Sequence, residues 1–245
     1  MNVYVAHARI LHKEPPKVEG RSGLMILKVG RDKPETEALI QSVNQVIVRI
    51  PPYLTARAER MEVDSYVEVF GHIGGIVRRS PVDGKQHLGS EIVVSNLQPA
   101  VAVDDGPDME QRLFNRWISI GLMRGVRTPS RENLPATAYV QIGRDRADKG
   151  RGFQHSGVVP MLAYGKQIER MGVFPEGASV HLEGRVTGLL RRVPKPGAEG
   201  GFESVLDAGL IIERSYPTAL VAQRLFEPEQ PRGGNKEAEK KAAAE

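Results

Sequence analysis

Short runs of β-branched, aromatic and other apolar residues recur along the chain, separated by clusters of glycine, proline and aspartate. Such runs are typical of β-strands joined by turns. In residues 66–73 every second position is apolar or glycine, so one face of that strand is expected to pack in a core while the other meets solvent. The pattern predicts an all-β protein with strands at residues 3–6, 24–29, 45–50, 66–70, 91–94, 117–123, 137–142, 157–164, 179–186 and 204–212.

Two blocks of the sequence return at one fixed spacing. Residues 29–33 (VGRDK) resemble residues 142–146 (IGRDR), and residues 71–79 (GHIGGIVRR) resemble residues 184–192 (GRVTGLLRR). Both pairs of blocks have the same offset in residue number, which a duplicated domain produces and a shared local composition does not. The period is also too long for solenoids or propeller blades, whose units run to roughly 20–50 residues.

One short helix is expected in each repeat, where residues 54–61 match residues 165–171 at an offset of 110. Five strands with a helix between the third and the fourth is the order of the OB-fold, a five-stranded Greek-key barrel. A turn-rich acidic segment with few apolar residues separates the repeats, and a charged segment with too little apolar content to fold alone follows them. We therefore expect two tandem OB-folds, at residues 1–103 and 113–219, with a linker at 104–112 and a disordered tail at 220–245.

Composition narrows the class of protein. The formal net charge is +4, which permits a nucleic acid partner without requiring one. The absence of cysteine excludes disulfides, thiolate catalysis and cysteine-rich zinc sites, and it suits a reducing compartment. No run approaches the roughly 18 apolar residues of a membrane helix, and the first residues lack the order of a signal peptide. These features predict a cytoplasmic protein without a membrane anchor.

The sequence offers no pattern for catalysis or metal binding. Its six histidines lack the paired spacing of a zinc or iron site. It contains no GxSxG turn, no phosphate-binding loop ending in Gly-Lys-Ser/Thr and no HExxH helix. We therefore expect a non-enzymatic binding protein with no metal and no cofactor.

Three segments of the second repeat resemble bacterial single-stranded DNA-binding proteins. Residues 115–121 resemble the first strand of that family, and residues 163–169 resemble its third strand, which runs through an aromatic-Gly-Lys turn into the helix. Residues 176–186 are similar to its Gly-Ser…Glu-Gly-Arg fourth strand. The resemblance covers residues 113–212, while the first repeat lacks the turn and has Pro52-Tyr53 there. It implies a protein that coats single-stranded DNA in replication, recombination or repair, from a branch with two OB-folds per chain that pairs as a homodimer.

The chain departs from the family in two ways. Family members stack bases on aromatic side chains, but only 5% of this chain is aromatic, with a single Trp. Arginine pairs stand in the hairpin where the family tends to place an aromatic residue. The family's acidic, apolar-tipped C-terminus, which recruits other enzymes, is replaced by Ala-Ala-Ala-Glu, so we expect no such recruitment.

The candidate nucleic-acid contacts fall into three groups. Basic residues after the second strand and in the hairpins are expected to neutralise phosphates, although they also suit a solvated sheet edge. Aromatic residues near the third strand are expected to stack on bases, although a Tyr before a helix is often a core anchor. The candidates are Arg31, Lys33, Arg144 and Arg146 after the second strands, Arg78, Arg79, Arg191 and Arg192 in the hairpins, and Tyr53, Phe153, Tyr164 and Lys166 around the third strands.

The assembly and the ligand leave alternatives open. Trp117 is expected to pack in the core or at an interface, and Val3 and Trp117 are the candidates for an apolar patch between two chains. The leading function is binding of single-stranded DNA with little sequence preference. The alternative is an OB-fold scaffold that bridges subunits of a replication or conjugation complex, and RNA remains a possible ligand because nothing addresses the 2′-hydroxyl.

Overall fold

The structure is a computed structural model, and it describes residues 1–30, 40–79, 86–101, 113–129, 134–143, 153–194 and 202–218. Strands make up most of this part of the chain, which confirms the all-β prediction. The first repeat contains β1 (Asn2–Glu14), β2 (Gly23–Lys28), β3 (Ile40–Val43), β4 (Gln45–Ile50), the 3₁₀ turn η1 (Pro52–Leu54), α1 (Thr55–Glu59), β5 (Tyr66–Arg79) and β6 (Gln86–Pro99). The second contains β7 (Phe114–Arg127), β8 (Ala136–Gln141), β9 (Phe153–Ser156), β10 (Val158–Ala163), α3 (Lys166–Val173), β11 (Ser179–Pro194) and β12 (Phe202–Pro217).

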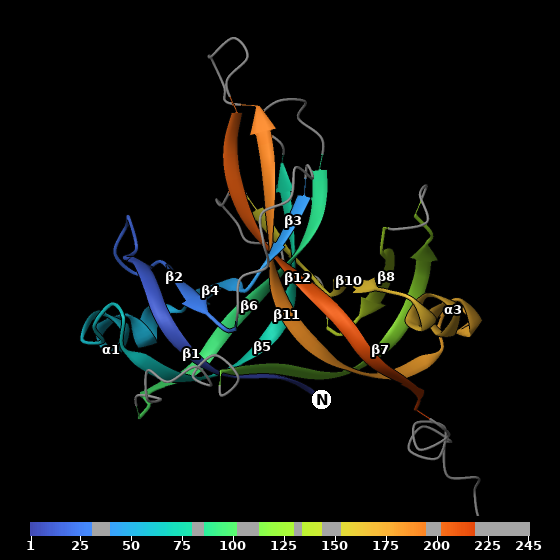
Figure 1. Cartoon of the computed structure of the whole chain (residues 1–245), viewed down its shortest axis with the longest axis horizontal. Helices are drawn as coiled ribbons and strands as arrows, with labels where there is room; N and C mark the ends of the chain where they lie inside the picture. Colours follow the sequence, from blue (N-terminus) through green and yellow to red (C-terminus); the bar gives the residue numbers. More distant parts are fainter. Residues whose placement is uncertain are drawn as a thin grey trace, which may run out of the picture.

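Five strands of each repeat close into a ring. In the first repeat β1 pairs with β2 and β5, β4 pairs with β2 and β6, and β5 pairs with β6. In the second repeat β7, β8, β10, β12 and β11 make the equivalent pairings. The β4–β6 and β10–β12 pairs are parallel and the other pairs of the rings are antiparallel. The predicted strands are thus found where the sequence places them, and the two helices lie at opposite ends of the molecule (Figure 1).

The core follows from the alternation of side chains along the strands. Val67, Val69 and Ile73 of β5 are buried, and so are their counterparts in β11. In β2 and β4 the buried apolar residues are Met25, Leu27, Val46, Val48 and Ile50, so the ring is filled by its own side chains. The predicted apolar face of residues 66–73 is therefore confirmed.

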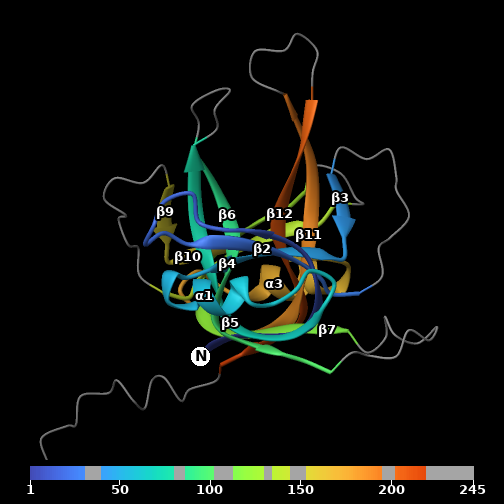
Figure 2. The same ribbon diagram turned by 90° about the vertical axis from the view of Figure 1, so that its left-hand side faces the viewer.

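The third strand of each repeat is broken into two pieces, which the sequence did not predict. β3 pairs with β11 of the second repeat, and β9 pairs with β5 of the first (Figure 2). Each repeat thus adds a short strand to the long hairpin of the other. Gly75 and Gly188, which are equivalent in the two repeats, lie at these crossings, where an added Cβ would overlap the backbone oxygens of Val158 and Gln45. Only glycine leaves room for the crossing chain.

The repeats are related by a local two-fold axis. β1 and β7 pair antiparallel with Tyr4 directly opposite Trp117, and these two residues are equivalent at the offset of the repeat. When a residue pairs with its own equivalent in the other repeat, the two-fold axis passes between the two residues. The axis therefore passes between Tyr4 and Trp117. A second such pair is Ser90 and Ala208, since their strands correspond at an offset of 118. The hairpins β5–β6 and β11–β12 accordingly rise side by side in the middle of the molecule (Figure 1).

Trp117 lies in the core and is fully buried. Its indole Nε1 donates to the carbonyl oxygen of Arg185 at 3.0 Å, and its ring packs beside Gly184. The prediction of Trp117 as part of a patch between chains is therefore wrong, because the alternation of β7 turns this side chain inward. Its counterpart in the first repeat is Tyr4 and not Val3, which remains 41% exposed on the outer face.

Within the described part of the chain, no helix combines the length and the apolar character needed to cross a membrane.

Candidate nucleic-acid interface

The structure places the candidate residues to different extents. Arg31, Lys33, Arg144 and Arg146 lie outside the described residues. The backbone of Arg79 belongs to β5, that of Arg191 and Arg192 to β11, and Phe153 begins β9. Side chains are described for Tyr53, Arg78, Tyr164 and Lys166.

The strand register brings together two candidates that are far apart in the sequence. Phe153 of the second repeat is the pairing partner of Arg78 of the first. The equivalent register in the other half pairs Arg191 with Ile40. The base of each arginine hairpin is thus held by a strand from the other repeat.

Arg78 has a charged partner in the other repeat. One guanidinium nitrogen lies 2.7 Å from a carboxylate oxygen of Asp207 on β12. The Arg78 side chain is 46% exposed, so the rest of its guanidinium reaches solvent. Arg78 therefore joins the two repeats, and a phosphate must share it with Asp207.

A basic cleft adjoins Arg78. It has a volume of about 360 Å³ and lies between the β1–β2 connection, β4 and the hairpin strand β5. Arg49 lines it, and its guanidinium lies 2.5 Å from the Glu91 carboxylate, with both side chains almost completely buried. The charged lining residues are Glu14, Lys17, Arg21, Arg49 and Arg78.

The cleft has only a small positive excess. Its four cations face the carboxylates of Glu14, Glu91 and Asp207, and Lys17 lies 3.4 Å from Glu14. The other three cleft cations, Lys17, Arg21 and Arg49, were not predicted from the sequence, since they stand outside the repeated blocks. Lys17 and Arg21 lie in the connection between β1 and β2, and Arg49 lies one residue before the end of β4. All three are therefore close to the end of a strand, which is the only sequence feature that they share.

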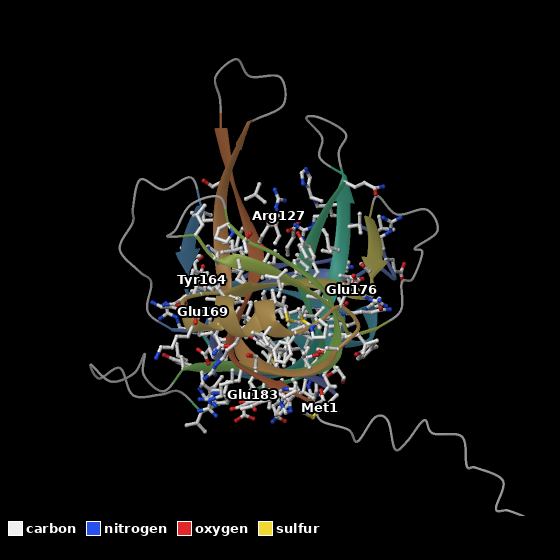
Figure 3. The ribbon with its side chains drawn as sticks, turned by 90° about the vertical axis from the view of Figure 1, so that its right-hand side faces the viewer. Met1, Arg127, Tyr164, Glu169, Glu176 and Glu183 are labelled. Carbon is white, nitrogen blue, oxygen red and sulfur yellow. The ribbon has the colours of Figure 1, made fainter. Side chains whose placement is uncertain are left out.

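Tyr164 lies between the end of β10 and the start of α3. Gly165 has a φ of 51°, a left-handed conformation that allows the chain to turn there. Tyr164 is 42% exposed, and it is labelled in Figure 3. Partial burial raises the pKa of Tyr164 above 10.0, although the Arg185 cation lowers it in part. The ring is therefore neutral at physiological pH and open on one side.

Two cations accompany Tyr164. Lys166 is exposed at the first position of α3. Arg185 lies 3.2 Å from Glu213, and Gln167 of α3 donates to the Glu213 carbonyl oxygen at 2.9 Å. This set of a half-exposed ring with neighbouring cations suits a base and its phosphates.

Tyr53 lies in the corresponding connection of the first repeat, within η1 after β4 and one residue before the position aligned with Tyr164. Its side chain is 71% exposed, and its hydroxyl lies 3.4 Å from the Val94 carbonyl oxygen. Arg57 of α1 donates to the side-chain oxygen of Asn96 at 3.0 Å close by. The two tyrosines thus mark opposite ends of the molecule, with the hairpins and the basic cleft between them.

Comparison with known proteins gives a relationship of fold. A deletion variant of the single-stranded DNA binding protein from Thermus aquaticus is similar over 94% of this chain and 98% of its own, with a TM-score of 0.51 and 14% identity. The wild-type protein covers 90% and 94%, with a TM-score of 0.49 and 13% identity. No family model matches the sequence. No curated protein sequence matches it either. At this identity the first likeness establishes a shared all-β, OB-like fold and nothing about the ligand.

Proposed function

We propose that this chain is a non-enzymatic single-stranded DNA-binding protein made of two tandem OB-folds. The observation that carries the proposal is the pair of exposed tyrosines, Tyr53 and Tyr164, each between the third ring strand and the following helix. The basic cleft beside Arg78 lies between the two tyrosines. A fold shared with a Thermus single-stranded DNA binding protein supports the same function.

Binding in this proposal combines stacking with phosphate neutralisation. Tyr53 and Tyr164 stack on bases, each contributing about 1–3 kcal/mol, without selecting the base. Lys166, the cleft residues and the hairpin arginines neutralise phosphates. Phe153 and the basic residues after the second strands, Arg31, Lys33, Arg144 and Arg146, are assigned to the same surface by their place in the sequence. Because few aromatic residues are available, electrostatics carries much of the affinity.

Titration of the purified chain with fluorescent oligo-dT at two salt concentrations tests this proposal. The logarithm of the binding constant is expected to fall with the logarithm of salt by about 0.7 for each phosphate neutralised. The same titration with oligo-rU separates DNA from RNA as the preferred ligand. A complete absence of binding at low salt would overturn the proposal.

The second candidate is a scaffold that bridges proteins of a replication or conjugation complex. Two observations favour it: aromatic residues are scarce, and Arg49 and Arg78 are already paired with carboxylates. An intact, folded chain that ignores oligonucleotides at low salt is the result that selects this candidate.

We also propose that two chains pair through the outer face of β1, β7, β11 and β12. Strand alternation turns four large apolar side chains to this face, and each is 41–46% exposed: Val3, Phe114, Leu122 and Tyr216. Met1 and Glu183 mark this side of the molecule in Figure 3. A homodimer would bring four OB-folds together and cover the face. Sedimentation at micromolar concentration tests it, and a single species of 26.9 kDa would contradict it.

The cellular setting follows from the same proposal. Single-stranded DNA is exposed during replication, recombination and repair, so we place the protein in the cytoplasm with that DNA. The boundaries of the two OB-folds at residues 1–103 and 113–219, joined by the segment 104–112, remain the division we propose. Limited proteolysis followed by mass measurement tests these boundaries.

A further inference from the structure

The local two-fold axis constrains how one strand of nucleic acid lies on the molecule. This inference rests on the proposed function, that a single strand contacts both repeats. The axis passes between Tyr4 and Trp117 and between Ser90 and Ala208. α1 and α3, which follow the two exposed tyrosines, lie at opposite ends of the long axis of the molecule (Figure 1). A strand that contacts both tyrosines therefore runs across the two-fold axis.

A half-turn about that axis exchanges the repeats and reverses the strand. A chain with two identical repeats would then hold the strand equally well in either direction, because turning the strand end for end gives the same complex. A directional preference is possible only where equivalent positions of the two repeats differ. The size of the preference equals the difference in contact free energy between the two arrangements.

The repeats differ at equivalent positions near the hairpins and near the tyrosines. Near the hairpins, the first repeat has the Arg49–Glu91 pair where the second has Leu162 and Gly209. Asp207, which holds Arg78, corresponds to Gly89 in the first repeat, so the hairpin arginine of the second repeat has no equivalent carboxylate at that position.

The ends of the path differ as well. Tyr164 lies close to Arg185 and two residues before Lys166. In the first repeat the corresponding residues are His72 and Ala56. Tyr164 thus has Arg185 and Lys166 nearby, Tyr53 has Arg57, and the cleft adds Arg49 and Arg78 beside the hairpin of the first repeat.

We infer that the chain binds a single strand in one fixed orientation, with its 5′ end always over the same repeat. The charged residues differ both at the hairpin and at the tyrosine, so reversing the strand replaces several contacts at once. Because one stacked base or one phosphate contact already changes affinity about tenfold, we expect a preference of at least about tenfold for one direction.

Single-thiol labelling tests this inference. The chain has no cysteine, so Val63→Cys or Val173→Cys gives a single site for a fluorescent donor. These residues are equivalent and exposed: Val63 follows α1, and Val173 is the last residue of α3, at the two ends of the molecule. Oligo-dT of about 24 nucleotides, long enough for two OB-folds, carries an acceptor at either its 5′ or its 3′ end. Mixing the labelled chain with a large excess of unlabelled chain ensures that a homodimer carries at most one donor.

A fixed orientation gives unequal energy transfer to the two ends, and the order reverses between the Val63→Cys and Val173→Cys proteins. Equal transfer to both ends from both sites, with anisotropy showing that the oligonucleotide is bound, overturns the inference and leaves the proposed function intact. No rise in anisotropy at low salt overturns both.

One substitution separates orientation from affinity. Ala56→Lys gives the first repeat the cation that Lys166 supplies to the second, at an exposed helical position where lysine is well tolerated. It is expected to tighten binding while reducing the difference in transfer between the two ends. Tighter binding with an unchanged or larger difference would contradict the assignment of orientation to the unequal tyrosine ends.

Discussion

The two repeats fill the same position between ring and hairpin with opposite chemistry. In the first, Arg49 of β4 lies beside β6 and is paired with Glu91, whereas in the second Leu162 of β10 lies beside β12 and Gly209 replaces the carboxylate. The backbone pairing is the same in both. The same backbone pairing therefore accepts either a buried ion pair or a leucine and a glycine, as expected when desolvation offsets most of the attraction between charges. What the first repeat gains is a basic cleft.

Breaking that ion pair on one side is expected to have the largest effect. Arg49→Leu copies the second repeat but leaves the Glu91 carboxylate buried without this partner, so we expect a loss of about 3–5 kcal/mol in the free energy of unfolding. The double variant Arg49→Leu/Glu91→Leu is expected to recover most of it. Urea unfolding measures both. A single variant as stable as the wild type would show that water reaches Glu91.

The crossing points test whether the two repeats depend on each other. Gly75→Ala and Gly188→Ala place a Cβ against the backbone of the other repeat, so each is expected to cost about 1–3 kcal/mol or more. Gly172→Ala is the control: it lies in α3, meets no atom within 4 Å, and is expected to be neutral or slightly stabilising. A loss in only one of the two crossing variants would show that one repeat folds without the other.

Much of the fold could be predicted because it depends on local pattern. The β-strand alternation, the repeated blocks and the two helices each leave a trace within a few neighbouring residues. β3 and β9 were missed because their stability comes from hairpins of the other repeat, and neither IQSV nor FQHS has a strong apolar alternation of its own. The reason for the glycines at 75 and 188 was missed on the same ground, since the atoms they accommodate are far away in sequence.

The site was predicted less completely than the fold. Tyr53, Tyr164 and Lys166 are exposed where the sequence placed them, because a turn between strand and helix is a local feature. The role of Arg78 was not predicted, since its partner Asp207 is 129 residues away. The cleft cations Lys17, Arg21 and Arg49 come from three separate segments, and only folding brings them together.

The tyrosines allow the two ends of the proposed path to be compared. Tyr164→Ala is expected to weaken binding of oligo-dT by about 1–2 kcal/mol, and Tyr53→Ala by less, because Lys166 and Arg185 lie near Tyr164 and would neutralise the phosphates of a stacked base in the proposed function. Fluorescence titration measures both, and thermal unfolding is the control for folding. If neither substitution changed the affinity for oligo-dT, neither tyrosine would contact the oligonucleotide, and both would have only a structural role.

The hairpin arginines are expected to differ between the repeats. Arg191→Ala/Arg192→Ala should lower affinity and flatten the salt dependence more than Arg78→Ala/Arg79→Ala, since Asp207 already neutralises much of Arg78. Asp207→Asn should release Arg78 and raise affinity a few-fold, while the loss of a half-exposed ion pair costs at most about 1 kcal/mol of stability. Lower affinity for Asp207→Asn would show that the pair positions the hairpin for binding.

The smallest effect at neutral pH is expected at the two-fold axis. Tyr4 and Trp117 are equivalent and fully buried, but the Trp117 indole donates a hydrogen bond, whereas the Tyr4 hydroxyl has no partner within the described part of the chain. Tyr4→Phe removes this buried hydroxyl, so stability at pH 7 should change by less than about 1 kcal/mol in either direction.

The side chains of Tyr4 and Trp117 at the axis are expected to affect stability differently at alkaline pH. Burial raises the pKa of Tyr4 above its ordinary value of 10.0. Below pH 10 the phenol is protonated in the folded and the unfolded chain, and its titration adds nothing. Above pH 10 the unfolded chain loses the proton while the folded chain keeps it, so stability falls by about 1.4 kcal/mol per pH unit until the raised pKa is reached. Tyr4→Phe lacks this loss, and its advantage over the wild type in urea unfolding should grow from pH 10 upward. A constant difference across that range would mean that the Tyr4 phenol ionises within the folded chain, and that water reaches the axis between the repeats.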